Sequence, residues 1–283
     1  MLTWAVFVAA LASAFLHACW NVLAKLHAAP ADLIRGIILA TASLCVVVLP
    51  FVGLPPIGSW PWIAAASACN VVFTQAMLQA YARSDFGMTY GIVRAVVPPI
   101  LFLVGWAFMN EAGRLHAVEG MALVVLSLLM FAFSGRRTRD REAGGMLLAM
   151  SAGAALAFAL LFDVNGIRAC GEGFSCLLPC AVASSLLTAA GLGLVSCVGR
   201  TNPLTVLRSH TKLCYVGAAL LLSSYLCGMW AYVHGPIGLV APLRESGIVF
   251  GGALAVWVLR EPVSRLQWTA MGLATIGVVL VQV

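Results

Sequence analysis

Apolar stretches of about twenty residues dominate this chain, and their length decides what it can fold into, because a helix needs about 20 apolar residues to cross a bilayer. Cutting the sequence at charged residues, Pro and Gly leaves ten such stretches, at roughly 3–23, 33–53, 62–82, 88–110, 115–134, 144–162, 174–198, 213–233, 238–259 and 266–283. They lack the apolar–polar alternation over about ten residues that marks a transmembrane β-barrel strand. We predict an all-α integral membrane protein with ten transmembrane helices.

The composition supports a bilayer as the solvent. Of the 283 residues, 62% are hydrophobic and 9% are charged, whereas soluble domains carry about 25% charged residues. The formal net charge of +6 does not indicate nucleic acid, because the basic residues lie at the ends of apolar stretches. We expect a monomer whose partners are the lipid bilayer and a small-molecule substrate, with no nucleic acid.

The cysteines and the N-terminus give no sign of a metal site or of processing. Nine cysteines are scattered without a CxxC pair, which favours small apolar packing residues, and we expect no metal and no cofactor. Cys170 and Cys176 share one short loop and could pair in an oxidising compartment, but free thiols are the expectation. No Lys or Arg precedes Lys25, so a cleaved signal peptide is not expected and the first stretch is predicted to be a retained span.

The two halves of the sequence match each other at an offset of 150 or 151 residues. The matched pairs are Tyr81 with Tyr232, Gly87 with Gly238, Arg94 with Arg244 and Glu111 with Glu261. The charged matches carry the most weight because charged residues are scarce here. We predict a first five-helix repeat at 1–134, a basic connecting loop at 135–143 and a second repeat at 144–283. Five helices per half invert the second repeat, as in many secondary transporters.

Basic residues in the predicted loops are strongly asymmetric. Two of them, Arg114 and Arg168, lie on one side of the predicted membrane, whereas the loops after spans 1, 3, 5, 7 and 9 hold Lys25, Arg83, Arg136, Arg137, Arg139, Arg141, Arg200, Arg208, Lys212, Arg260 and Arg265. Cytoplasmic loops carry the excess of Lys and Arg. The prediction is that these loops are cytoplasmic and that both termini lie outside.

Several segments resemble one known family. They are "LHACWNVLAK", "AYARSDFGMTYGIVRAVVPPILF" and "NEAGRLHAVEGMALVVLSLLM" in the first half and "AYVHGPIGLVAPLRESGIVFGGALAVWVLREPVSRLQWTAMGLATIGVVLV" in the second. These resemble EamA-type transporters of the drug/metabolite transporter superfamily over nearly the whole chain, with Glu111 and Glu261 as the most recognisable mark. The resemblance implies ten helices, alternating access and efflux of small metabolites, as in bacterial inner-membrane exporters of aromatic and other amino acids. Many relatives are drawn with both termini inside, unlike the orientation predicted from charge.

Arg94 and Arg244 lie inside apolar stretches, where a charge at the bilayer centre costs at least ~2.5 kcal/mol. Each could snorkel to a headgroup region, or both could line an aqueous cavity and bind an anionic group such as a carboxylate. Glycines share their helical faces, which favours a protein-facing position. We predict Arg94 toward the cytoplasm and Arg244 toward the outside, as two gates.

Other polar and aromatic residues inside the stretches suggest the rest of a cavity. Those predicted to line it are His17, Trp20, Asn21, Gln75, Gln79, Tyr81, Tyr90, Tyr225, Trp230 and Tyr232. Interhelical hydrogen bonds or core packing explain the same residues almost as well. As a cavity lining, Trp20, Tyr90, Tyr225 and Tyr232 would suit a flat or aromatic ligand with one polar end.

Two further pairs bear on mechanism. Pro98 and Pro99 lie within one stretch and indicate either a packing kink or a hinge, because proline removes a helical hydrogen bond. Glu245 and Asp163 are the candidates for proton coupling, and facilitated diffusion is the alternative.

The function predicted from the sequence is a secondary transporter that exports small metabolites, with aromatic amino acids favoured. The alternative is a nucleotide-sugar or phosphorylated-metabolite exchanger, since paired arginines could hold phosphate. An enzyme is not expected, because the five histidines are dispersed and neither HExxH nor GxSxG occurs.

Overall fold

The computed structural model describes residues 2–25, 27, 30–84, 86–108, 115–134, 143–171, 173–198, 203–258, 260 and 264–282. Regular structure within these residues is entirely helical. The helices are α1 (Trp4–Lys25), α2 (Pro30–Val52), η1 (Ile57–Ser59), α3 (Trp60–Tyr81), α4 (Phe86–Phe108), α5 (Leu115–Phe133), α6 (Ala143–Cys170), α7 (Phe174–Val198), α8 (Pro203–Ser209), α9 (Thr211–His234), α10 (Ile237–Glu245), α11 (Gly247–Trp257) and α12 (Arg265–Gln282). Glu111, Glu261 and most of the predicted basic loop lie outside the described residues.

The helices have the length and composition of membrane spans. Among the described residues, 9 helical segments are long and apolar enough to cross a membrane, and α12 supplies a shorter apolar helix at Arg265–Val281. Large apolar side chains are exposed on their outer faces, among them Val47, Phe51, Leu103 and Leu194. Such a surface suits lipid and not water. The prediction of a helical, multi-pass membrane protein is confirmed at this level.

Helix α6 is longer than predicted, and its end is cross-linked. The helix continues to Cys170, because Asp163, where the sequence was cut, lies buried inside it. A disulfide then joins Cys170 to Cys176, whose Cα atoms are 5.7 Å apart. The expectation of free thiols is therefore wrong for this pair, since the turn between α6 and α7 brings the two Cα atoms within disulfide range.

The ninth predicted span is interrupted, whereas the fourth is not. Helix α10 ends at Glu245 and α11 begins at Gly247, with the Ser246 N–H donating to the Leu243 carbonyl at 3.1 Å. Pro242 lies one turn before this break and removes a backbone donor there. Pro98 and Pro99 both lie inside the continuous helix α4. The break thus falls next to Arg244 and not at the predicted proline pair.

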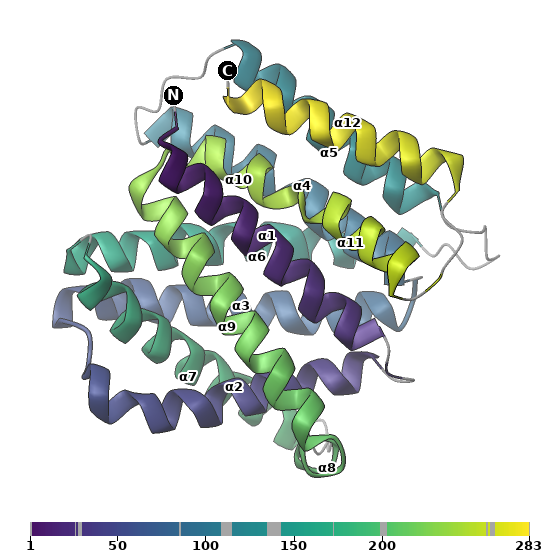
Figure 1. Ribbon diagram of the computed structural model, residues 1–283. Coiled ribbons are helices and arrows are strands. Elements are labelled where there is room, and N and C mark those ends of the chain that lie inside the picture. Colours follow the sequence, from purple (N-terminus) through teal and green to yellow (C-terminus); the bar gives the residue numbers. More distant parts are fainter. Residues whose placement is uncertain are drawn as a thin grey trace.

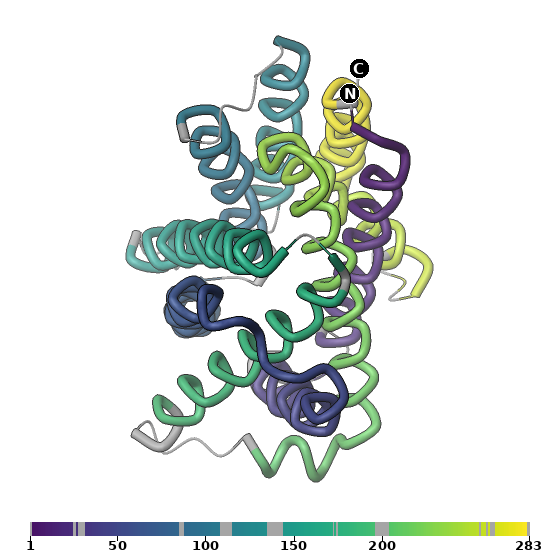
Figure 2. The backbone as a smooth tube through the Cα atoms, turned by 90° about the vertical axis from the view of Figure 1, so that its left-hand side faces the viewer, coloured from purple at the N-terminus to yellow at the C-terminus, as the bar shows by residue number. Residues whose placement is uncertain are grey.

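The helices cross in a bundle with two distinct edges. Helices α5 and α12 run along each other at one edge, and α2 and α7 lie at the opposite edge (Figure 1). Between them, α3 packs against α6 and α1 packs against α9, while α4 contacts α10. Both ends of the chain lie close together in the two views (Figures 1 and 2). The centre of the bundle is therefore enclosed by helices from both halves of the sequence.

Two glycines set the spacing of α5 and α12. A Cβ placed on Gly120 would lie 2.5 Å from the carbonyl oxygen of Gly277, and one on Gly277 would lie 2.6 Å from that of Gly120. Small residues allow this backbone approach between membrane helices. The α5–α12 seam, defined by these two glycines, leaves no room for a side chain.

Gly277→Val is expected to destabilise the fold, because overpacking a tight contact costs about 1–3 kcal/mol. Gly272→Val is the matched control, since Gly272 lies on the same helix with nothing within 4 Å of its Cβ position. Thermal unfolding in detergent should show a lower midpoint for Gly277→Val than for Gly272→Val. Equal midpoints would mean that the seam tolerates a side chain.

Candidate functional site

A cavity of about 200 Å³ lies at the centre of the bundle. Its wall is mostly apolar and includes Ile34, Ile37, Phe73, Met77, Leu156, Leu160 and Leu221. Of the residues predicted from the sequence, it is lined by His17, Trp20, Asn21, Tyr81, Tyr90, Arg94, Asp163, Tyr225 and Arg244. An apolar enclosure with a few polar groups is the usual form of a small-ligand site.

A buried ion pair joins the two halves beside this cavity. Arg94 Nε on α4 lies 2.8 Å from Glu245 Oε2 on α10, and the side chains are 5% and 2% exposed. The Arg94 guanidinium also lies over the Tyr90 ring, 5.7 Å from its centre. A charge this deep is tolerated only with a partner of opposite sign. Glu245 therefore neutralises Arg94.

This contact corrects the prediction of two separate gates. Arg94 reaches the residue next to Arg244, and both arginines line the same cavity. The reason is that α4 and α10 pack directly together, so the helices that carry the two arginines meet at the same cavity. We call the cluster of Arg94, Arg244, Glu245 and His17 the arginine end.

A pair of serines positions Arg244. The Arg244 Nε donates to Ser13 Oγ at 3.1 Å. The Ser13 and Ser224 hydroxyls each donate to the other residue's backbone carbonyl, at 2.7 and 2.8 Å. Gly228 leaves the room for this contact, because a Cβ there would lie 2.8 Å from Ser13 Oγ and 3.1 Å from Arg244 Nε. Helices α1 and α9 thus hold Arg244 in a fixed position.

Arg244 keeps its charge available to the cavity. Its guanidinium lies 5.9 Å from the centre of the Tyr232 ring, and it makes no ion pair within the described part of the chain. With Glu245 engaged by Arg94, the arginine end holds two positive charges and one negative charge. The surplus charge suits an anionic group on a ligand.

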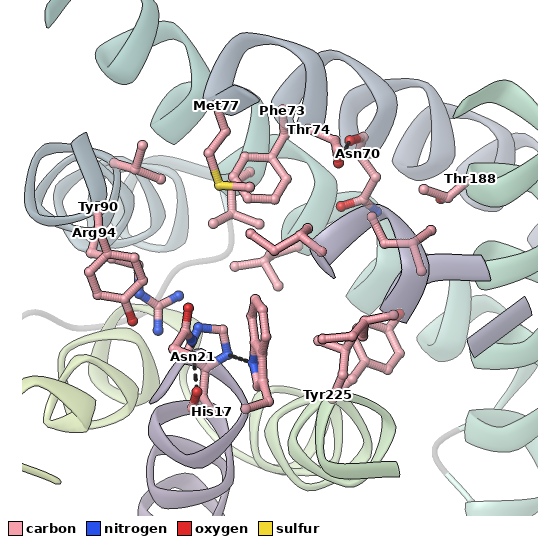
Figure 3. A pocket seen from close by; sticks show the side chains of 18 of the residues that line it. His17, Asn21, Asn70, Phe73, Thr74, Met77, Tyr90, Arg94, Thr188 and Tyr225 are labelled. Atoms are coloured by element: carbon pink, nitrogen blue, oxygen red, sulfur yellow. Dashed lines mark hydrogen bonds between the residues drawn. The ribbon is translucent and has the colours of Figure 1, made fainter. Parts of the chain in front are cut away.

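Three α1 residues that were predicted to line the cavity, His17, Trp20 and Asn21, do so beside these charges. The Trp20 Nε1 donates to His17 Nδ1 at 3.1 Å, and the Asn21 amide donates to the His17 carbonyl at 2.7 Å. Figure 3 shows His17 and Asn21 near Arg94 and Tyr90. Trp20 and Tyr90 give this end two aromatic surfaces.

A second polar cluster lies at the other side of the cavity. Ser184 Oγ donates to Asp163 Oδ1 at 2.8 Å, and Tyr225 lines the cavity together with Asp163. Thr188 lies one turn further along α7 and also lines the cavity. Figure 3 places Tyr225 and Thr188 away from Arg94. We call Asp163, Ser184, Tyr225 and Thr188 the aspartate end.

The face that α3 turns to the cavity differs from the predicted one. Asn70, Thr74 and Tyr81 line it, whereas Gln75 lines a small surface pocket and Gln79 is exposed. The two faces differ by a single residue in register. Asn70 and Thr74 share one helical face with the predicted Tyr81, and this spacing was the signal that sequence reasoning missed.

Two aromatic residues of α9 and the prolines of α4 also lie off the cavity. Tyr232 is fully buried behind Arg244, and the Trp230 ring stacks on His234, 4.5 Å between centres. Pro98 is buried in α4, and Pro99 lines a separate apolar pocket on α4 and α5. Of the aromatic residues predicted on α9, Tyr225 is the one that faces the cavity.

Comparison with known proteins identifies a structure with a similar fold but does not identify a family. No protein-family model and no curated protein matches the sequence. One solved crystal structure is similar to this chain with a TM-score of 0.74 at 14% sequence identity, covering 97% of this chain and 94% of that one. The likeness shows that the same fold extends over nearly the whole chain.

Glu245→Gln is expected to be strongly destabilising, because it leaves Arg94 buried without a countercharge, at a cost of about 3–5 kcal/mol. The double variant Arg94→Gln/Glu245→Gln should recover part of the loss, since no lone charge remains. Asp32→Asn is the control, because its ion pair with Arg35 is half-exposed and is worth at most about 1 kcal/mol. The midpoints of thermal unfolding in detergent rank the stabilities of these variants. A double variant less stable than Glu245→Gln would contradict the expectation.

Proposed function

We propose that the protein is a secondary transporter that exports small metabolites, with aromatic amino acids favoured, by alternating access. The observation that carries the proposal is the buried Arg244, which faces the central cavity without a carboxylate partner among the described residues. A buried guanidinium on a mostly apolar cavity wall is a strong site for a ligand carboxylate. Efflux as the direction rests on the resemblance to EamA-type exporters.

The shape of the cavity supports an amino acid over the alternative substrate. Its volume of about 200 Å³ lies below the range of about 300–1,000 Å³ typical of drug-sized ligands, and a nucleotide sugar is larger than such a site. Arg94 is also committed to Glu245, so one arginine remains for the ligand where a diphosphate would use several. Tyr90, Trp20 and Tyr225 offer surfaces for an aromatic side chain.

The packing supports the ten-span inverted repeat. Relating α1 to α6, α2 to α7, α3 to α9, α4 to α10–α11 and α5 to α12 makes the contacts reciprocal. The α3–α6 contact then corresponds to α9–α1, α4–α6 to α11–α1, and α3–α7 to α9–α2. An even number of crossings also agrees with chain ends that lie close together (Figure 1).

Two independent features support the proposed orientation in a bacterial inner membrane. The charge bias places the loop between α6 and α7 on the outer side. The Cys170–Cys176 disulfide closes that loop, and disulfides persist in oxidising compartments. The opposite side would then be cytoplasmic.

Proteoliposomes that hold the purified protein are expected to take up radiolabelled tryptophan, phenylalanine, threonine or alanine in a saturable way. Arg244→Gln should lower uptake of the accepted substrates at least tenfold, because the carboxylate loses its charged partner. The control Arg208→Gln removes an exposed charge on α8 and should match the wild type.

The alternative substrate class is tested in the same vesicles. Preloading with a nucleotide sugar should not stimulate uptake of the labelled form from outside. Exchange of the nucleotide sugar with no uptake of any of the four amino acids would overturn the proposal.

The orientation predicts the activity of reporter fusions. A reporter enzyme that is active only in the periplasm should be active when fused after Val283 and silent when fused after Arg208, because the two positions face opposite sides. Reporter activity is compared between cultures that express the two fusions at equal levels. A silent fusion at Val283 with an active one at Arg208 would reverse the orientation.

A further inference from the structure

Asp163 is a buried carboxylate that the Arg244 site does not use. It is 4% exposed and lines the cavity at the aspartate end. Ser184 donates a hydrogen bond to it and Tyr225 lines the same cavity, and both hydroxyls are neutral. An ionised carboxylate held among neutral groups is costly when water is excluded. It therefore needs a proton or a ligand group whenever the cavity closes.

Among the described residues, no Lys or Arg pairs with Asp163. The helices α3, α4, α7, α9 and η1 pack against α6. The titratable side chains that face Asp163 from them are Cys69 on α3, Cys180 on α7 and Tyr225 on α9, and η1 contributes the Ser59 hydroxyl, which donates to the Gly166 carbonyl.

Arginines on α4 and on α6 are engaged elsewhere. From α4, Arg94 is held by Glu245. On α6 itself, Arg168 donates to the Tyr232 carbonyl at 3.2 Å. Asp163 makes no ion pair with either of them, or with any other described residue.

Glu245 is the other buried carboxylate beside the cavity, and its surroundings are opposite. Arg94 lies 2.8 Å away, so its negative charge is compensated in the closed interior. Taking a proton at Glu245 would leave Arg94 buried without its partner. The two carboxylates that the sequence offered for proton coupling are thus distinguished by their partners.

We propose that Asp163 is the proton-exchange site of the transport cycle. The inference rests on the proposed transport function and adds the coupling to it. Without substrate, Asp163 binds one proton from the outside and carries it inward as a neutral carboxylic acid. When substrate enters from the cytoplasm, the acid releases that proton to the cytoplasm, and the carboxylate accepts a hydrogen bond from a donor group of the substrate.

The exchange balances at one proton inward for each substrate outward. The carboxylate holds either the proton or the donor group of the substrate, never both, which is the condition for obligatory exchange. Because closure with a bare carboxylate is disfavoured, neither step runs uncoupled. A transmembrane pH gradient, acidic outside, would then drive export.

Carbodiimide labelling tests the site without any substrate. Dicyclohexylcarbodiimide adds to protonated carboxyl groups in apolar surroundings, and mass spectrometry locates the adduct. Labelling of Asp163 is expected at pH 6, with a loss as the pH rises to 9, and none is expected at Glu245. Ser184→Ala should increase labelling at pH 7, because a hydroxyl that stabilises the ionised form is gone. No adduct at Asp163 across this range would overturn the proposal.

Vesicle transport then tests the coupling. Wild-type protein should exchange labelled for unlabelled amino acid at equal pH and should accumulate it when a pH gradient is imposed. Asp163→Asn removes a substrate contact and is expected to slow exchange, so the readout is the ratio of accumulation to exchange, which should fall at least tenfold. Asp32→Asn, an exposed carboxylate outside the cavity, should keep both. Accumulation that survives in Asp163→Asn would overturn the proposal.

The two proposals fail in different ways. Wild-type vesicles that exchange none of the four amino acids would contradict the proposed transport function, whatever the labelling shows. Exchange without any response to the pH gradient would contradict proton coupling alone. If Asp163→Asn loses exchange as well, the Ser184→Ala labelling decides, because an unchanged yield at pH 7 would rule out Asp163 as the exchanging group.

Discussion

The ion pair between Arg94 and Glu245 is the constraint on which the centre of the molecule depends. Each charge would be prohibitive alone in an apolar interior, and together they tie α4 of the first half to α10 of the second. Compensation of Arg94 leaves Arg244 as the surplus charge, fixed by Ser13 rather than by a carboxylate. The interior is therefore neutral where the halves meet and positive where the cavity begins. A single ion pair decides which of the two cavity-lining arginines is compensated and which keeps a surplus charge.

Much of the fold could be predicted from the sequence because apolar length is a strong signal in a membrane protein. The errors have local causes. Asp163 was taken as the end of its helix because a charge usually marks a boundary, yet neutral hydrogen bonds keep it inside α6. Gln75 and Asn70 lie on neighbouring faces of α3, and one sequence does not tell which face its neighbours cover. The Cys170–Cys176 bridge and the Arg94–Glu245 contact depend on how helices are placed, which no local pattern encodes.

The cavity has two polar ends of opposite character separated by an apolar wall. The arginine end has fixed charges that hold one another, and the aspartate end has a carboxylate with neutral donors. Fixed charge is suited to binding, because it does not change as water leaves, whereas an uncompensated carboxylate changes its charge with its surroundings. In the proposed transport cycle, substrate binding on α10 and proton exchange on α6 would be separate. The break at Ser246 lies directly after Arg244 and Glu245.

The α5–α12 seam has a consequence for how such a molecule can move. Backbones in contact at Gly120 and Gly277 cannot approach further, and parting them would open a gap that lipid must fill. The seam would therefore lie near the rotation axis if the two halves of the bundle rotate against each other as rigid bodies. In a rigid-body rotation, displacement grows with distance from the rotation axis. The smallest shifts would then fall on α5 and α12, and the largest on α2 and α7 at the far edge (Figure 1). Two spectroscopic labels, one on α2 or α7 and one on α5 or α12, would show the largest change in distance during such a rotation.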